Sequence, residues 1–212
     1  MNNEPNHLNE FRDTLQRNGA HYELLLDENA LARLTAYYEL ILAWNMRLHL
    51  VAPCSAAEFA TRHVLESLIL ARHLQKNARV IDVGSGAGLP SIPNLIVRPD
   101  TRATLIEASP KKGVFLREAL RHCGISEQAN VVVERFEKAP PPVAEYVTCR
   151  ALDRFSEMVP KLIAWAPRPC TLLLFGGDAV RQEIEKAGLD YSSVLIPDSE
   201  RRFVFICGEG SP

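Results

Sequence analysis

Three glycines follow a short apolar run in the segment RVIDVGSGAGLPSIPNLI, residues 79–96. In an α/β protein, a loop at the carboxyl end of a buried strand is where ligands bind. Glycine permits positive φ and lets a ligand approach the backbone without meeting a Cβ atom. The spacing of Asp82, Gly84, Gly86 and Gly88 therefore predicts a loop that holds a small molecule.

Three ligand classes compete for this loop. A phosphate-binding P-loop requires a Lys-Ser or Lys-Thr pair after its glycines, and none follows here. A dinucleotide fingerprint requires GxGxxG, and Leu89 occupies its third glycine position. The remaining pattern, DxGxGxG, resembles the first motif of methyltransferases that use S-adenosylmethionine (SAM), in which the loop surrounds the methionine part of the cofactor.

Two further apolar runs end in residues suited to the rest of a nucleoside. ATLIEA ends near Glu107, whose carboxylate can accept hydrogen bonds from both ribose hydroxyls, in NAD and SAM enzymes alike. NVVVERFE is expected to be a strand ending in Phe136 and Glu137, where backbone groups and an apolar ring could flank an adenine. Each acid alone could be a solvated strand end, but three consecutive strand ends favour a binding site.

The residues before this region have a helical pattern. Residues 6–18 predict one helix, ending near Gly19, and Ser55 with Glu58 forms a capping-box pattern at the start of another. Residues 30–50 predict an amphipathic helix whose apolar positions are Leu31, Leu34, Tyr38, Ile41, Leu42 and Met46. We expect residues 1–76 to be a helical extension and residues 77–212 a methyltransferase domain, together one compact unit.

From Arg79 onward, short apolar runs alternate with helical stretches, which predicts βαβ units and a largely parallel sheet. The last two runs, YSSVLIP and RRFVFIC, are separated only by a turn and must pair antiparallel. The expected fold is therefore α/β: a Rossmann-like, seven-stranded, mostly parallel sheet with an antiparallel last strand. This is the layout of class I SAM methyltransferases, by analogy.

Composition bears on the partners, the cofactors and the cellular location to be expected of the protein. The 212 residues carry a formal net charge of −2, which neither requires nor excludes an RNA partner. Five scattered cysteines without a CxxC pair favour reduced thiols over a zinc site or disulfides, so no metal is expected. The polar N-terminus and the lack of a long apolar run predict a cytoplasmic protein without a membrane segment, which we expect to be a monomer.

Longer motifs make the resemblance specific. IDVGSGAGLPSIP, LIEASPKKGVFLREAL and VTCRAL, with LAWNMRLHLVAP and RHVLESL in the helical region, resemble the RsmG (GidB) family of bacterial 16S rRNA guanine-N7 methyltransferases. The resemblance covers about residues 30–206. It implies SAM as cofactor, and 16S rRNA or the small ribosomal subunit as partner.

The resemblance also implies roles for individual residues. SAM contacts are expected from the glycine loop, the second and third strand ends and the arginine of VTCRAL: Gly84, Gly86, Gly88, Leu89, Glu107, Phe136, Glu137 and Arg150. Arg150 is also the candidate for orienting the reactants, through its rigid guanidinium. RNA contacts are expected from Lys111, Lys112, Arg62 and His63. No catalytic base is assigned, because guanine N7 loses no proton when it is methylated.

Several positions depart from the family pattern: His49, Val51, Glu66, Ser91 and Phe175, while Glu107 stands in place of an aspartate. Most of these positions are ones where the protein would contact substrate RNA or where side chains pack locally. The changes therefore concern the identity of the acceptor more than the binding of SAM. Two alternatives stay open on this ground. One is a SAM methyltransferase with a different acceptor, either another RNA, a protein or a small molecule; the other is an inactive relative that binds ribosomes.

Overall fold

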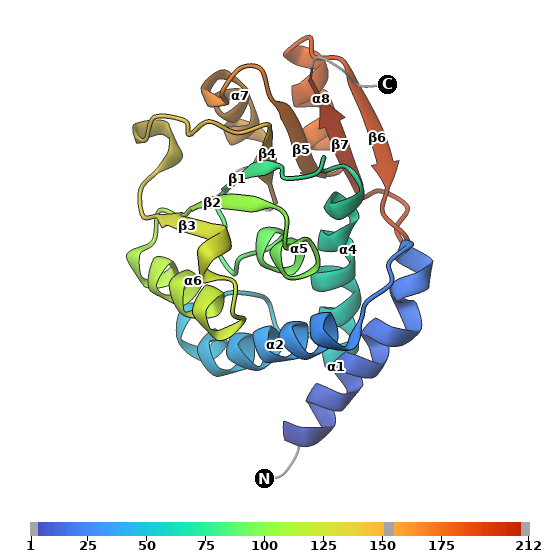
Figure 1. Ribbon diagram of the computed structural model, residues 1–212. Coiled ribbons are helices and arrows are strands. Elements are labelled where there is room, and N and C mark those ends of the chain that lie inside the picture. Colours follow the sequence, from blue (N-terminus) through green and yellow to red (C-terminus); the bar gives the residue numbers. More distant parts are fainter. Residues whose placement is uncertain (1–3, 151–154, 209–212) are drawn as a thin grey trace.

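The computed structural model describes residues 4–150 and 155–208, which form a seven-stranded sheet with helices on both faces (Figure 1). The strand order is β3-β2-β1-β4-β5-β7-β6. Neighbours from β3 to β5 are parallel, whereas β7 is antiparallel to both β5 and β6, as the sequence predicts. The strands are β1 (Arg79–Val83), β2 (Arg102–Ile106), β3 (Ala129–Val132), β4 (Tyr146–Cys149), β5 (Thr171–Gly176), β6 (Tyr191–Leu195) and β7 (Phe203–Cys207).

Helices cover the two faces of the sheet unequally (Figure 1). One face carries α7 (Phe155–Trp165) and α8 (Asp178–Lys186). The other carries α5 (Ser91–Val97), α6 (Pro110–His122) and a helical segment over residues 56–72, and a further layer lies outside it, made of α1 (Glu4–Asn18) and α2 (Glu28–Leu48). Short 3-10 turns are η1 (Gly19–Tyr22), η4 (Ser126–Gln128) and η5 (Phe136–Lys138).

Alternation along the strands divides the core into two layers. Val80 and Leu105 face the thicker helical side, whereas Ile81 and Val83 pack under α7 and α8. Asp82 lies in the same strand, between the two residues of the second group, and is fully buried. The strands therefore read as nearly continuous apolar runs, as expected for a parallel sheet covered on both faces.

Helix α2 buries four of the six positions that its sequence predicts: Leu31, Leu34, Tyr38 and Ile41. Asp27 caps the helix by accepting the Ala30 N–H at 2.7 Å. Leu42 is 45% exposed and Met46 is 90% exposed, although the spacing predicts both on the buried face. Tyr37, outside the predicted stripe, is completely buried. In this part of the helix Trp44 and Leu48 pack against the core, Trp44 against the ring of Phe115, so Leu42 and Met46 lie on the other side of the helix and face solvent.

The segment over residues 56–72 is helical but not uniform. Ser55 Oγ accepts the Glu58 N–H at 3.1 Å, which confirms the predicted N-cap. The α-helical turn α3 (Ala56–Glu58) then widens into a π-helical turn, η2 (Phe59–Leu65), followed by α4 (Glu66–Leu68) and the 3-10 turn η3 (Ile69–Arg72). Neither helical spacing nor composition predicts that change of winding.

The third strand is shorter than the sequence predicts. It ends at Val132, and Phe136 and Glu137 belong instead to η5, which begins after three intervening residues. The turn begins where the chain leaves the edge of the sheet, since β3 is an outermost strand and has a neighbour on one side only. Phe136 and Glu137 nonetheless lie at the carboxyl edge of the sheet, beside the ends of β1 and β2.

Candidate active site

The glycine loop is fixed to the neighbouring strand by its first two residues. The N–H groups of Gly84 and Ser85 both donate to the carbonyl oxygen of Ile106, at 2.9 and 3.1 Å. The loop leaves β1 with positive φ at Gly84, Gly86 and Gly88, of 73°, 54° and 86°. Because these values belong to the left-handed region, the three glycines are required by the course of the backbone.

Gly88 has a second reason to be glycine. A Cβ atom there would lie 2.3 Å from Cδ1 of Ile92 and 3.3 Å from a methyl carbon of Leu116. The loop therefore packs directly onto α5 and α6 through a residue that has no side chain. Gly88 supports the loop from behind and is absent from the wall of the cavity described below.

Glu107 closes the loop from the end of β2. Its carboxylate accepts the Gly86 N–H through Oε2 and the Ser109 N–H through Oε1, each at 2.8 Å. Each oxygen has further acceptor capacity, because a carboxylate offers about four lone-pair sites. The side chain can therefore shape the loop and still accept hydrogen bonds from a ligand.

A cavity of about 620 Å³ opens above these residues at the carboxyl edge of the sheet. Most of the predicted site residues line it: Gly84, Gly86, Leu89, Glu107, Phe136, Glu137, Arg150, Lys112 and His63. Lys111 and Arg62 do not, and lie on exposed helical turns nearby. Its volume suits a ligand of nucleoside size or larger. The glycine cradle and the free acceptor sites of Glu107 fit SAM, so the residues present agree with the predicted cofactor.

Phe136 forms a wall of the cavity rather than projecting into it. It is 5% exposed and its ring packs edge-on against Trp165, with centroids 5.4 Å apart. Glu137 lies 3.6 Å from the guanidinium of Arg135. This part of the cavity offers an apolar surface beside backbone groups, the combination expected for an adenine.

The guanidinium of Arg150 is directed into the helical segment over residues 56–72. One terminal nitrogen donates to Ser67 Oγ at 2.9 Å and to the His63 carbonyl at 3.4 Å. The other donates to the Arg62 carbonyl and to Glu66 Oε2, the latter at 3.3 Å. These four bonds use the four N–H donors of the terminal nitrogens and do not involve the Nε–H group. Arg150 thus lines the cavity while holding its helical wall; the next two residues of VTCRAL lie outside the described residues.

Glu66 is the centre of an ionic network that the sequence does not reveal. Its carboxylate is 2% exposed and contacts both Arg150 and Arg202, the second of which lies between β6 and β7. Burial raises the pKa of Glu66, and the two arginines oppose that rise. Burial and the charge of Glu66 raise the pKa of Tyr22 to about 12. The network joins three segments of the chain beside the cavity.

Tyr37 is a second site residue that sequence reasoning missed. Its hydroxyl donates to the carbonyl of Ala87, within the glycine loop, at 2.7 Å. Burial raises the pKa of this phenol well above 10. The available indication was the spacing of Ala30, Leu34, Tyr37 and Ile41, which continues one face of α2 at three- and four-residue steps.

Asp82 lies beneath the loop, without an exposed atom. Neither carboxylate oxygen has a hydrogen-bond partner in the described residues, which is also true of the hydroxyl of Ser91. Burial raises the pKa of Asp82 to about 7, and the nearby serine hydroxyls of Ser91 and Ser85 offset part of the rise. Asp82 is therefore buried below the loop and does not line the cavity.

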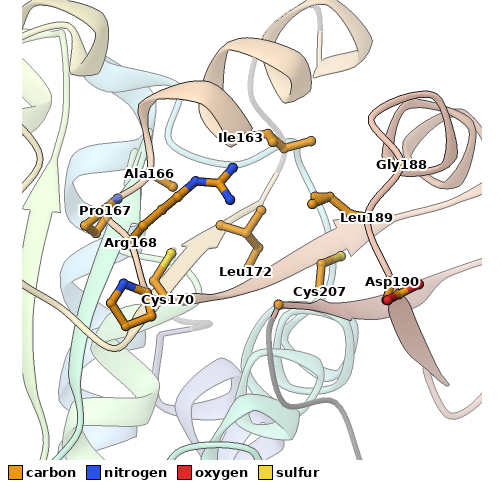
Figure 2. Close-up of a pocket in the computed structure, with 12 residues that line it drawn as sticks. Ile163, Ala166, Pro167, Arg168, Cys170, Leu172, Gly188, Leu189, Asp190 and Cys207 are labelled. Carbon is orange, nitrogen blue, oxygen red and sulfur yellow. The ribbon is translucent and has the colours of Figure 1, made fainter.

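A second cavity, of about 520 Å³, lies at the opposite edge of the sheet (Figure 2). It is formed where β5 begins and β7 ends, and Figure 2 shows Leu172 between Cys170 and Cys207. None of the predicted site residues lines it. The residues that could do chemistry are gathered at the carboxyl edge, and the glycine-loop cavity is the candidate site.

Two absences apply within residues 4–150 and 155–208. No group of three or more histidine, cysteine, aspartate or glutamate side chains is placed to hold a metal ion there. Among the helices of the same ranges, none combines the length and the apolar character needed to cross a membrane.

Comparison with known proteins decides the family. The model of the family "GidB: rRNA small subunit methyltransferase G" matches residues 30–204. The chain belongs to this family. A relative from Gluconobacter oxydans, named ribosomal RNA small subunit methyltransferase G, is 34% identical over 172 residues, covering 78% of this chain and 85% of its own length. A relative of the same name from Xanthomonas campestris is 38% identical over 135 residues, 63% of each chain.

Solved structures agree on the fold. A SAM-dependent methyltransferase from Aquifex aeolicus superposes with a TM-score of 0.54 at 17% identity, covering 68% of this chain and 89% of that one. The family and the fold that the sequence predicts are confirmed. The chain is a methyltransferase.

Proposed function

We propose that this methyltransferase transfers the methyl group of SAM to N7 of a guanine in 16S rRNA. The observation that carries the proposal is the cavity at the carboxyl edge, where the glycine loop and Glu107 meet in a chain matched to the family over residues 30–204. The names of the curated relatives supply the substrate class, small-subunit ribosomal RNA. The protein would then act in the cytoplasm, where ribosomal subunits are assembled.

Within the cavity, the residues divide by the part of SAM that they would bind. Gly84, Gly86 and Leu89 would surround the methionine part, with Gly88 holding the loop on α5. Glu107 would accept the ribose hydroxyls through its free lone pairs. The turn at Phe136 and Glu137 would flank the adenine.

The proposed reaction requires little acid–base chemistry from the residues of this chain. Bound SAM supplies an electrophilic methyl group on a sulfonium. Guanine N7 has a free lone pair and loses no proton, so no residue of the chain has to act as a general base. The cavity walls would hold the base and the cofactor in line and would exclude water, which is the main source of acceleration in such a transfer. Arg150 contributes by fixing the wall that contains His63.

The RNA would approach over the first turn of α6. Lys112 lines the cavity and Lys111 is exposed beside it. The helix dipole disfavours cations at a helix N-terminus. Contact with RNA phosphates would explain why two lysines occupy this position. Arg62 is exposed on the helical turn that contains His63, 2.8 Å from the carboxylate of Glu58.

The test is methyl transfer from labelled SAM to small ribosomal subunits from cells that lack this protein. Strand cleavage specific for N7-methylguanine would locate the product, and a single modified guanine is expected. Gly84→Leu should abolish transfer and SAM binding together, because its side chain would crowd the loop. SAM binding without transfer to subunits or to naked 16S rRNA would refute the proposed acceptor. Subunit binding without any transfer would identify an inactive relative.

A further inference from the structure

The wall of the cavity that faces the glycine loop contains the π-helical turn Phe59–Leu65. Its wider winding is shown by the Glu66 N–H, which donates to the carbonyl of Thr61, five residues back. Single π-helical turns inside longer helices are frequent at functional sites, because they displace one side chain from the regular helical positions. Here the turn contains His63, which lines the cavity.

His63 is held in place by contacts on both its backbone and its ring. Its carbonyl accepts hydrogen bonds from Ser67 Oγ and from the guanidinium of Arg150. Its ring packs against Phe59, with centroids 5.1 Å apart and planes tilted by 41°. Phe59 itself is 1% exposed and belongs to the core. The imidazole is therefore fixed relative to the cavity.

The surroundings of His63 keep its imidazole neutral. Burial lowers its pKa to about 4, and the cations of Arg150, Arg62 and Arg202 add to the decrease, whereas Glu58 opposes it. A neutral imidazole has one N–H donor and one acceptor nitrogen. Within the described part of the chain, neither ring nitrogen is hydrogen-bonded to a protein group, so both remain for a ligand in the cavity.

Methylation at N7 places positive charge on the purine, which makes its N–H groups stronger donors in the transition state. A neutral imidazole that accepts such an N–H would stabilise this charge, whereas an imidazolium would oppose it. We propose that His63 binds the acceptor guanine, accepting a hydrogen bond from an N–H of its amide edge while N7 faces the methyl group. The proposal rests on the proposed function and adds the residue that recognises the base.

The experiment compares three substitutions at one position in single-turnover transfer to small ribosomal subunits, with SAM affinity measured by calorimetry. His63→Ala removes the ring together with its nitrogens. His63→Phe keeps an aromatic ring against Phe59 but has no ring nitrogen. His63→Gln keeps one hydrogen-bond acceptor and one donor group. We expect transfer to fall about 100-fold in the Ala and Phe variants and to recover to within about tenfold of wild type in Gln. SAM affinity should stay within about threefold in all of them, because the proposed role is toward the base.

The outcomes separate a chemical role from a packing role. If His63→Phe transfers methyl as fast as wild type, the nitrogens are not needed and the proposal is overturned. If His63→Gln is as slow as Ala while binding SAM normally, a hydrogen bond to the base is likewise excluded. A wild-type protein that binds SAM and methylates no subunit refutes the proposed function itself, and this proposal with it. If the wild-type protein methylates the subunits and His63→Ala does so equally fast, only the role of His63 is refuted and the proposed function is not.

Discussion

The hydroxyl of Tyr37 donates a 2.7 Å hydrogen bond to the carbonyl of Ala87, although 50 residues separate the two in the sequence. Tyr37 belongs to α2, and Ala87 lies in the glycine loop after β1. The helical layer that precedes the sheet therefore supports the cofactor loop directly. This bond and those of Arg150 favour our expectation that residues 1–76 and 77–212 act as one compact unit.

Removal of this hydroxyl should affect both stability and cofactor binding. Tyr37→Phe leaves the buried Ala87 carbonyl without its donor, which should lower the free energy of unfolding by about 1–2 kcal/mol. The loosened loop should weaken SAM binding about three- to tenfold, measured by calorimetry. Tyr38→Phe is the matched control, because no hydrogen bond of its hydroxyl is found in the described structure. Equal effects at both positions would contradict the role of Tyr37.

Gly88 should tolerate no side chain. Gly88→Ala combines a φ of +86° with a Cβ atom 2.3 Å from Ile92, so we expect a loss of about 3 kcal/mol in unfolding free energy and at least tenfold weaker SAM binding. Gly124→Ala has a similar φ of +66° but no atom within 4 Å, and should cost about 1 kcal/mol without changing SAM affinity. Urea unfolding measures the loss of stability and calorimetry measures SAM affinity. Equal losses in the two variants would show that the contact of Gly88 with Ile92 is not the cause.

The buried carboxylate of Glu66 should matter more than an exposed one. Glu66→Ala leaves Arg150 and Arg202 without their shared anion and should lower the free energy of unfolding by about 3 kcal/mol. Glu145→Ala removes an exposed pair with Arg79, whose side chain is 53% exposed, and should cost less than about 1 kcal/mol. Chemical denaturation measures both; a Glu66 variant as stable as the Glu145 variant would show that the network is energetically neutral.

Asp82 should make stability depend on pH. Its folded pKa of about 7 exceeds the ordinary 3.8, so the folded state holds the proton more tightly and stability from this group falls as pH rises between those values. Asp82→Asn should therefore gain stability relative to wild type from pH 5 to pH 8, in urea unfolding without SAM. At Asp100, whose pKa is lowered by Arg98, the same substitution should change stability by a constant amount over that range. A flat difference for Asp82→Asn would contradict the raised pKa.

The sequence predicts the catalytic edge well because the relevant patterns are local. The glycine loop, the strand before it and the acid at Glu107 all lie within one βαβ unit, where spacing along the chain fixes position in space. The seven strands and the antiparallel pairing of the last one follow from short apolar runs and a turn. The fold is confirmed without any knowledge of distant contacts, and the roles of the loop and Glu107 toward a ligand stay predictions.

What the sequence leaves out depends on contacts between distant segments. Arg150 appears in a motif suited to hold an anionic ligand, yet its four terminal donors are used by residues more than 80 positions earlier. The contact between Glu66 and Arg202 spans 136 positions. The exposure of Met46 likewise depends on which side of α2 is covered by the neighbouring helices, which helical periodicity alone does not determine.

The contact of Glu66 with Arg202 has a consequence for the order in which the protein is completed during synthesis. Glu66 leaves the translating ribosome early, with the helical wall of the cavity, whereas Arg202 emerges with the final hairpin. Until then, the carboxylate lacks one of its two cations, and the wall that includes His63 is not fully fixed. The nascent chain therefore finishes its binding site last, and a chain released before its final hairpin would have a glycine loop but an unfinished pocket.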